Sequence, residues 1–238
     1  MNVKVLKYDP SRDQEPYFVS GEVPFKERMT ALEILQYFHE NVCAINFDYN
    51  CACRLCGRCA MMINGIPGMA CVTKVEDKDY IFEPLKGYPV IRDLIVDKTN
   101  MENRLSSIYN RTRIEDITAE TFSAPVEKFE PEHRDDLYAM EFCARCGACT
   151  AACPIASAKP DEYIGPMGMI AYAYRHYDPL DQGDRIVQAV SSGLFRCIEC
   201  GMCDTVCAQH DIHHVEIFRS LKDVARKRNL VPSYASNE

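Results

Sequence analysis

The chain has 238 residues, a formal net charge of −8 and a sequence pI of about 5.3. Its hydrophobic share of 47% and charged share of 26% are ordinary for a globular chain, which argues against disorder, and the length leaves room for two compact cores. No basic surface dominates, which argues against a nucleic-acid partner.

The unusual feature of the composition is its fourteen cysteines, of which Cys43 stands apart from the others. In a secreted protein they would indicate disulfides, but the opening stretch, MNVKVLKYDPSRDQEPYF, has no apolar core of signal-peptide length. We therefore expect a reducing compartment, the cytoplasm. No apolar run approaches the roughly eighteen residues of a membrane span, so a link to a membrane would come through a partner subunit.

Residues 1–103 are predicted to form a small α+β domain. The stretch VKVLKY and the stretch around YFVSGEVPF alternate as a hairpin does, and Thr30 is a candidate N-cap for a helix over ALEILQYFHEN. In that helix Leu32, Leu35 and Phe38 share one face. Further on, DYIFEP and YPVIRDLIVD are strand-like. We therefore expect strands wrapped around one helix, with cysteines in the loop after it.

The next stretch, MENRLSSIYNRTRIEDITAETFSAPVEKFEPEHRDDL, is charged, poor in large aliphatic residues and interrupted by Pro125 and Pro131. This composition is typical of a linker, so we place the domain boundary near residue 103. In residues 104–238 helical spacing runs through MGMIAYAYRHYDP, DRIVQAVSSGLF and HHVEIFRSLKDVARKRNL. The second domain is therefore expected to be helical.

The first cysteine group reads CACRLCGRCAMMINGIPGMAC. Cys51, Cys56 and Cys59 have the C-x4-C-x2-C spacing of plant-type ferredoxins, and Cys71 completes four thiolates for two irons bridged by two sulfides. A Gly-rich loop there lets backbone amides point at the sulfurs. The alternative is a structural zinc site, although those usually pair two CxxC knuckles. Cys53 either replaces a ligand or points away.

Two later runs, CARCGACTAACP from Cys143 and CIECGMCDTVC from Cys197, repeat one spacing. The first is the complete CxxCxxCxxxCP motif of bacterial ferredoxins, in which the fourth cysteine ligates the other cluster of the pair. The two runs should therefore exchange their last members, with zinc again as the alternative. One set would be Cys143, Cys146, Cys149 and Cys207, and the other Cys153, Cys197, Cys200 and Cys203.

This order of motifs, together with INGIPGMAC and PVIRDLIVD, resembles the iron-sulfur subunit of succinate dehydrogenase and fumarate reductase over nearly the whole chain. The resemblance implies an N-terminal 2Fe-2S ferredoxin-like β-grasp domain and a C-terminal all-α helical ferredoxin domain. It implies an oxidoreductase of anaerobic respiration or the tricarboxylic acid cycle, in which this subunit is a non-catalytic electron carrier. Its partners would be an FAD-containing catalytic subunit and a membrane anchor that holds the quinone, with or without haem b, at the cytoplasmic side of the membrane.

The resemblance also assigns the clusters to individual cysteines. It puts a 2Fe-2S cluster on Cys51, Cys56, Cys59 and Cys71, a 4Fe-4S cluster on Cys143, Cys146, Cys149 and Cys207, and a 3Fe-4S cluster on Cys153, Cys197 and Cys203. The chain departs from the family at Cys200, a position that is usually apolar and offers no thiolate to a fourth iron. We therefore expect a second 4Fe-4S cluster there, and the 3Fe-4S form is the alternative if Cys200 is turned away.

Other departures follow the two runs. Family members linked to ubiquinone have a tryptophan soon after the CP pair, whereas this chain runs CPIASAKPDEY and has no Trp, which favours menaquinol and fumarate reduction. Ala208 stands where the last run usually has Pro. His210, His213 and His214 would serve in capping or subunit contacts, or in quinone binding and proton relay. The basic stretch RSLKDVARKRNL would contact an anchor or lipid headgroups, or simply favour a helix C-terminus.

No motif for substrate chemistry occurs in the sequence, which has neither a nucleophile with a nearby base motif nor a Gly-rich dinucleotide fingerprint. We therefore predict that the isolated chain would not turn over succinate or fumarate. The alternative function is the iron-sulfur subunit of a thiol-linked fumarate reductase or heterodisulfide-reductase-like enzyme, where two complete 4Fe-4S motifs would be natural. Those relatives usually carry a further cysteine-rich domain. A zinc-stabilised interaction module without a redox role is the other alternative.

Overall fold

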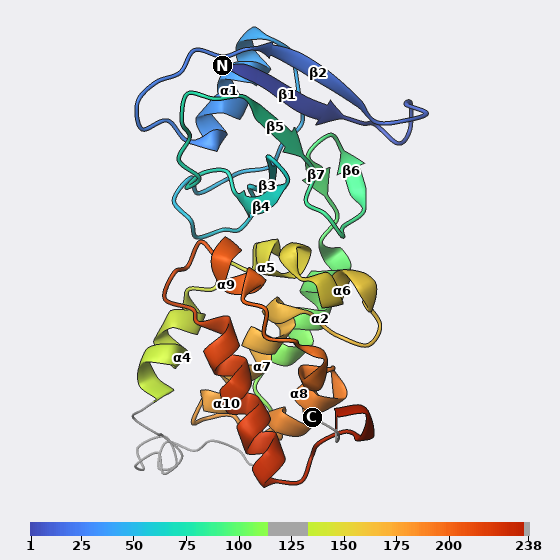
Figure 1. Cartoon of the computed structure of the whole chain (residues 1–238), viewed down its shortest axis with the longest axis vertical. Coiled ribbons are helices and arrows are strands. Elements are labelled where there is room, and N and C mark those ends of the chain that lie inside the picture. Colours follow the sequence, from blue (N-terminus) through green and yellow to red (C-terminus); the bar gives the residue numbers. More distant parts are fainter. Residues whose placement is uncertain (114–132, 236–238) are drawn as a thin grey trace. The chain divides into compact units, whose positions relative to one another are not determined.

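The computed structural model describes residues 1–113 and 133–235 (Figure 1). The chain divides into two compact units. The first consists of Met1–Asn100, Cys143–Ala152 and Thr205–Gln209, and the second of Met101–Phe142, Cys153–Asp204 and His210–Glu238. The first unit therefore takes two short segments from the cysteine-rich runs in the later part of the chain.

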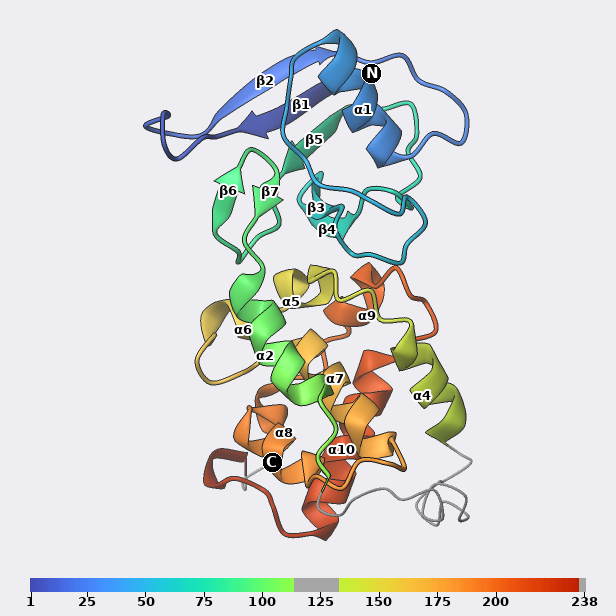
Figure 2. The same ribbon diagram turned by 180° about the vertical axis from the view of Figure 1, so that it is seen from behind.

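The first unit is built on a five-stranded mixed sheet in the order β2-β1-β5-β3-β4. Strands β1 and β2 form the predicted antiparallel hairpin, with Val5 opposite Val19, while β5 runs parallel to β1 and antiparallel to β3. These strands are β1 (Asn2–Lys7), β2 (Tyr17–Glu22), β3 (Ala60–Ile63), β4 (Ile66–Met69) and β5 (Tyr80–Glu83). The stretch YPVIRDLIVD gives a separate pair, β6 (Val90–Arg92) and β7 (Ile95–Val96), seen clearly in Figure 2.

Helix α1 (Ala31–Asn41) lies across one face of the sheet and begins at Thr30, as predicted (Figure 1). The Thr30 side chain accepts a hydrogen bond from the Glu33 amide, and the Glu33 carboxylate accepts one from the Thr30 amide at 2.8 Å. Hydrogen bonds from Thr30 hold the pKa of Glu33 below its ordinary value. Leu35 and Phe38 are fully buried in one core with residues of β1 and β5, including Phe82. The cap and this apolar face together place the cysteine loop that follows the helix.

The second unit is helical, as predicted. The three predicted helical stretches are confirmed as α7 (Pro166–Tyr177), α8 (Arg185–Ser191) with a 3-10 turn at Leu194–Arg196, and α10 (His214–Lys227). Helix α10 packs on α7 and α8, and its buried residues include Ile217, Phe218 and Leu221. Shorter helices inside and beside the cysteine runs are α4 (Arg134–Glu141), α5 (Ala148–Ala152), α6 (Pro154–Ala158) and α9 (Met202–Val206).

The prediction of a linker after residue 103 is wrong at both ends of that stretch. Helix α2 (Thr99–Tyr109) occupies its start, where Leu105 and Ile108 are buried, and α4 begins at Arg134 near its end. These apolar residues have helical spacing, but the polar and charged residues around them hide the pattern. Pro125 and Pro131 lie outside the described residues. Within the parts of the chain that the structure describes, no helix has the length and apolar character needed to cross a bilayer.

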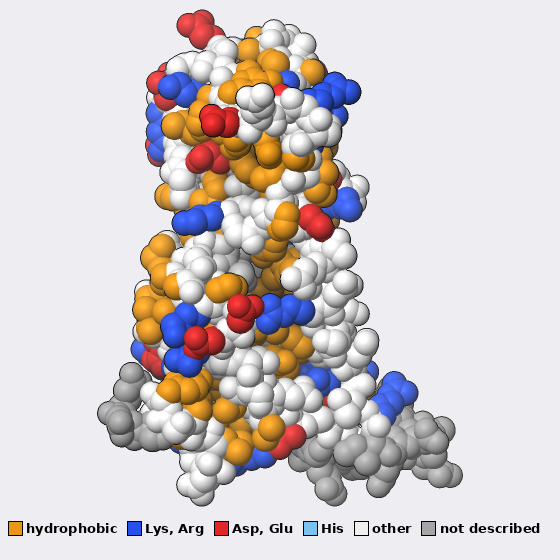
Figure 3. Space-filling model, turned by 90° about the vertical axis from the view of Figure 1, so that its right-hand side faces the viewer, with side chains coloured by type: hydrophobic (Ala, Val, Ile, Leu, Met, Phe, Trp, Pro, Cys, Tyr) orange, Lys and Arg blue, Asp and Glu red, His pale blue; other side chains and the backbone are white. Residues whose placement is uncertain are grey.

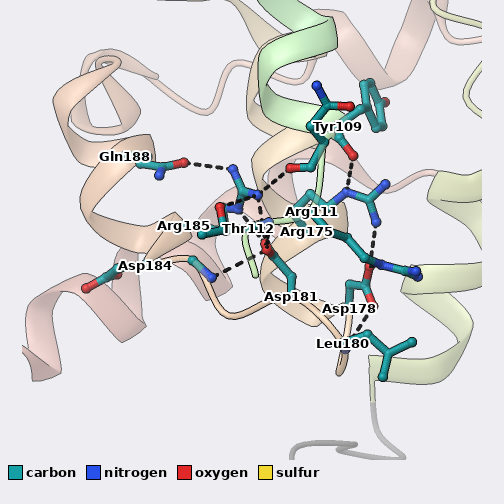
Figure 4. A network of polar contacts seen from close by, with 12 residues as sticks. Tyr109, Arg111, Thr112, Arg175, Asp178, Leu180, Asp181, Asp184, Arg185 and Gln188 are labelled. Atoms are coloured by element: carbon teal, nitrogen blue, oxygen red, sulfur yellow. Dashed lines mark hydrogen bonds and ion pairs between the residues drawn. The ribbon is translucent and has the colours of Figure 1, made fainter. Parts of the chain in front are cut away.

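A buried polar network ties the end of α2 to the segment between α7 and α8 (Figure 4). The guanidinium of Arg185, a residue only 3% exposed, pairs with the Asp181 carboxylate and donates to the Asn110 carbonyl at 2.7 Å. Arg111 and Arg175 pair with Asp178 in the same way. Burial acts to raise the pKa of Asp181, but hydrogen bonds, chiefly from Arg185, hold it below its ordinary value.

We expect that replacing Arg185 with Met lowers the free energy of unfolding by about 3–5 kcal/mol, because a buried carboxylate then lacks its cation. The matched control is Arg228→Met, which removes a half-exposed pair with Asp184 and should cost less than about 1 kcal/mol. Urea unfolding of both variants measures the difference. Equal, small losses would contradict the assignment of the network as a stabilising core.

The network also predicts a pH dependence. The pKa of Asp181 is lower in the folded chain than in the unfolded chain. Its contribution to the free energy of unfolding is therefore fully present above the unfolded pKa and is lost as pH falls through the folded pKa. The Arg185→Met variant should lose this part of the acid sensitivity.

Candidate metal centres

All fourteen cysteines are free thiols, and the two compact units separate them into sets. The first cysteine group, the segment 143–149 and Cys207 belong to the first unit, whereas Cys153 belongs to the second unit together with the segment 197–203. The last cysteine of each run is thus grouped with the other run. This is the arrangement that an exchange of last members requires, and the ligand sets remain a prediction.

In the first set, the Cys51 sulfur sits in a nest of backbone amides. The N–H groups of Cys53, Leu55 and Cys56 donate to its Sγ at 3.4, 3.3 and 3.3 Å. The loop is tight, because Ala52 has a φ of 51°. Hydrogen bonds from Cys53 and Cys56 lower the pKa of Cys51 to about 6. The loop therefore stabilises a thiolate, the form that binds iron.

The opposite side of this set is buried. Cys59 and Cys71 are 2% and 7% exposed, and the amide of Ala70 donates to the Cys59 carbonyl at 3.0 Å. Burial raises the pKa of Cys59 to about 12, and the neighbouring thiols of Cys71 and Cys56 act in the same direction. Crowded thiols of this kind ionise together only beside a cation. Their number and chemistry fit a cluster of two irons.

The two remaining cysteines of the N-terminal part have different surroundings. Cys53 is exposed and lies beside Cys51, whose hydrogen bond raises the pKa of the Cys53 thiol. Cys43 is half-buried, and its sulfur accepts a hydrogen bond from Lys7 Nζ at 3.8 Å. Cys53 therefore lies next to one proposed ligand of the first set, and Cys43 has a partner of its own.

In the second set, Cys146 and Cys149 lie near a partly buried tyrosine, Tyr88. Gly147 separates them with a φ of 89°, and a Cβ on it would lie 2.7 Å from the Tyr88 hydroxyl. Burial raises the pKa of Tyr88, and the charges of Cys149 and Cys146 raise it further. Burial also raises the pKa of Cys146, against which the Lys98 ammonium acts. Tyr88 therefore stays protonated beside the sulfurs and can donate to them.

In the third set, the Cys153 sulfur caps α6 and accepts the Ala156 amide at 3.5 Å. The Tyr163 hydroxyl is buried, and no group among the described residues bonds to it with good hydrogen-bond geometry. Burial raises its pKa, as do the neighbouring thiols of Cys197, Cys153 and Cys203, and the Cys197 sulfur is a weak acceptor for it. The hydroxyl is therefore placed to donate to a sulfur of this set.

Cys200 lies in an exposed turn of the same set. Glu199 and Gly201 on either side have φ values of 57° and 76°, and the Cys200 thiol is close enough to raise the pKa of Cys153. Two cations of the basic stretch hold this turn. Lys222 Nζ donates to the Cys197 carbonyl at 2.7 Å and to Glu199 at 2.8 Å, and Arg219 donates to Glu199 at 2.7 Å.

The three histidines after Cys207 differ in exposure. His210 and His213 are exposed, whereas His214 is 2% exposed and its Nδ1 lies 3.1 Å from the Asp204 carboxylate. The same carboxylate accepts the His214 amide at 2.6 Å and so caps α10. Burial acts to raise the pKa of Asp204, but the hydrogen bonds from His214 lower it. The capping group is therefore Asp204, whose carboxylate the His214 ring also contacts, and the roles predicted for the three histidines stay predictions.

Several residues near the cysteines have no signal in the sequence. Tyr88, Tyr163 and Lys98 belong to no motif, and only the fold brings them to the thiols. Lys222 lies in the basic stretch, but that stretch does not indicate its bond to the Cys197 carbonyl. From the sequence alone, a lysine at such a position would be assigned to the surface and a tyrosine to the core.

Comparisons with known proteins agree with this geometry. Residues 2–103 match the family described as "2Fe-2S iron-sulfur cluster binding domain", and residues 139–210 match "4Fe-4S dicluster domain". Over 98% of this chain and 98% of the other, the fold resembles a chain of the Mycobacterium smegmatis Sdh1 complex in the apo form, with a TM-score of 0.80 and 23% identity.

Relatives among curated proteins fall into two lengths. The chain is 33% identical to a subunit of the CoM/CoB fumarate reductase of Methanothermobacter marburgensis, over 87% of this chain and 40% of that protein. It thus spans about two-fifths of the length of that relative. It is 30% identical to the fumarate reductase iron-sulfur subunit of Haemophilus influenzae over 88% of this chain and 87% of that one. The corresponding subunit of Mycobacterium tuberculosis is 31% identical, over 86% and 85%. The chain therefore belongs to the family of iron-sulfur subunits of fumarate reductase and succinate dehydrogenase.

Proposed function

We propose that the chain is the electron-transfer subunit of a membrane-bound quinol:fumarate reductase or succinate:quinone oxidoreductase. The observation that carries the proposal is the grouping of Cys207 with the segment 143–149 and of Cys153 with the segment 197–203. The proposed ligands are Cys51, Cys56, Cys59 and Cys71 for 2Fe-2S, Cys143, Cys146, Cys149 and Cys207 for 4Fe-4S, and Cys153, Cys197, Cys200 and Cys203 for a second 4Fe-4S cluster.

When bound, the clusters supply one-electron carriers. The residues of the chain hold and tune them. Burial of Cys59 and Cys71 excludes water from one side of the first site, and the amides around Cys51 stabilise its thiolate. Tyr88 and Tyr163 place hydroxyl donors beside the second and third sets. Hydrogen bonds to cluster sulfurs and exclusion of solvent are among the factors that set the potential of an iron-sulfur cluster.

The proposed partners are an FAD-containing catalytic subunit, where the dicarboxylate would react, and an anchor with the quinone, with or without haem b. The sheet-bearing part of the chain keeps apolar side chains on its surface (Figure 3). The exposed apolar residues of the first unit include Tyr17, Phe18, Ile66 and Ile81. Exposed apolar side chains of this size are what a subunit interface would cover.

The finer parts of the proposal rest on the sequence. The absence of tryptophan favours menaquinol as the electron donor and fumarate reduction as the working direction. Attachment through the anchor would place the chain at the cytoplasmic side of the membrane. We keep the division into residues 1–103 and 104–238, which the family match to residues 2–103 supports.

A specific observation favours a second candidate, a thiol-linked fumarate reductase or heterodisulfide-reductase-like enzyme. Cys200 gives the two later runs eight cysteines, enough for two 4Fe-4S clusters. The relative from Methanothermobacter marburgensis is named as part of a CoM/CoB fumarate reductase. In this candidate the electrons would be exchanged with a thiol–disulfide couple instead of a quinone. The proposed cysteine ligands are the same in both.

Iron analysis and EPR of the anaerobically purified complex test the function. We expect about ten irons per chain, from two plus four plus four, and no three-iron signal in the oxidised state. The Cys200→Ser variant should lose about one iron and gain that signal. Zinc in place of iron would overturn the proposed function. A three-iron signal in the natural complex would remove only Cys200 from the ligand set.

The electron donor separates the two candidates. The purified complex, with the partners that accompany it, should reduce fumarate with a menaquinol analogue and not with the thiols of coenzyme M and coenzyme B. The opposite result would favour the thiol-linked enzyme. The isolated chain should show neither activity, and turnover by it alone would contradict its role as an electron carrier.

Replacing Tyr163 with Phe should lower the reduction potential of the third cluster, because a hydrogen bond to sulfur favours the more negative reduced form. The change is nearly isosteric, so the fold should be kept. The matched control is Tyr172→Phe, which removes a buried hydroxyl bonded to Ser192 at 2.9 Å in the same unit. Redox titration followed by EPR measures both. An unchanged potential in Tyr163→Phe would show that this hydroxyl does not reach the cluster.

A further inference from the structure

We infer that Lys98 is a positioning residue shared by the first and second cluster sites. Its ammonium group joins the two ligand loops and adds one positive charge between them. The inference rests on the proposed function, because it concerns how the chain holds and tunes two of the proposed clusters. Lys98 belongs to no cysteine motif, and it lies shortly after β7, just before α2 begins at Thr99.

The contacts of Lys98 join two segments that are far apart in the sequence. Its Nζ donates to the Gly57 carbonyl at 3.1 Å and to the Cys146 carbonyl at 3.0 Å. Gly57 follows Cys56, a proposed ligand of the first cluster, and Cys146 is a proposed ligand of the second. All of these residues lie in the first unit. One half-buried ammonium therefore bonds to both ligand loops at nearly the same distance.

The two loops touch at this point. Gly57 has a φ of 67°, and a Cβ on it would lie 2.3 Å from the Ala144 carbonyl oxygen and 2.9 Å from Cys146 Cα. Only glycine allows this approach. The carbonyl oxygens of Gly57 and Cys146 both face the Lys98 ammonium. An ammonium has three N–H donors and can bond to both oxygens, whereas a neutral aliphatic side chain can bond to neither.

The charge of Lys98 acts on the thiols as well as on the loops. Its Nζ is bonded to the carbonyl of Cys146, a proposed ligand of the second site, and to that of Gly57, next to the proposed ligand Cys56 of the first site. The positive charge of Lys98 therefore lies close to both sets of thiolates and opposes their mutual repulsion. Addition of an electron makes a cluster more negative, so a fixed positive charge between two clusters should raise both reduction potentials.

The experiment compares three variants in the purified complex, Lys98→Met, Lys98→Gln and Lys98→Arg. The control is Lys78→Met, which removes the same formal charge from the first unit. Lys78 pairs with the exposed carboxylate of Glu76, and the structure gives it no bond to a cluster loop among the described residues. The readouts are iron content and the reduction potentials of all clusters, from redox titrations followed by EPR.

We expect Lys98→Met and Lys98→Gln to shift the first and second potentials to more negative values and to leave the third unchanged. Lys98→Arg and Lys78→Met should resemble the natural protein. Loss of iron from both sites in the two neutral variants, with retention in Lys98→Arg, would equally support the shared role.

Unchanged first and second potentials in either neutral variant would overturn the inference, and so would a shift of only one of them. Loss of iron in all three Lys98 variants would overturn it too, because Lys98 would then serve folding alone. These results differ from failure of the proposed function, which would appear as missing iron in the natural complex.

Discussion

The repulsion among crowded, partly buried thiols is the constraint on which the rest of the structure depends. Burial, with the neighbouring acidic groups, raises the pKa of Cys203 to about 12, and the pKa of Cys59 is raised in the same way. Bringing ionised thiols this close together is unfavourable unless a cation compensates their negative charge. Iron provides that compensation, and metal binding of this kind is coupled to folding.

The path of the chain enforces this coupling. Within a few residues after Cys149 the chain leaves the first unit for the second, and after Cys203 it returns to the first unit. Each unit is therefore completed by a segment of the other cysteine run. The short helices α5 and α9 lie at these crossings, and helices of that length have little stability of their own in water. Their stability must come from what the cysteines bind and from packing.

Much of this was open to prediction from sequence, and what was missed has a physical reason. Cysteine spacing and the apolar periods of α1, α7 and α10 are local patterns, so they predicted the domain types and the candidate ligands. The α2 helix was missed because Leu105 and Ile108 stand among polar and charged residues. Lys98 and Tyr163 were missed because their roles come from tertiary contacts, with Gly57 and with the Cys197 thiol. No local pattern encodes such contacts.

The surroundings of the third set show how opposing charges meet at one site. A fourth thiolate from Cys200 would add a negative charge and lower the potential of a cluster there. The positive charge of Lys222 opposes this added negative charge. The Glu199 carboxylate pairs with Lys222 and also with Arg219, so it neutralises part of the charge of both cations. The Tyr163 hydroxyl, for which the Cys197 sulfur is a weak acceptor, is the neutral donor at this site. The neutral Tyr163 hydroxyl and the partly neutralised Lys222 ammonium therefore compensate only part of the negative charge that a Cys200 thiolate would add. If Cys200 is a ligand, the third cluster of this chain should therefore have a lower potential than one held by three cysteines in the same surroundings.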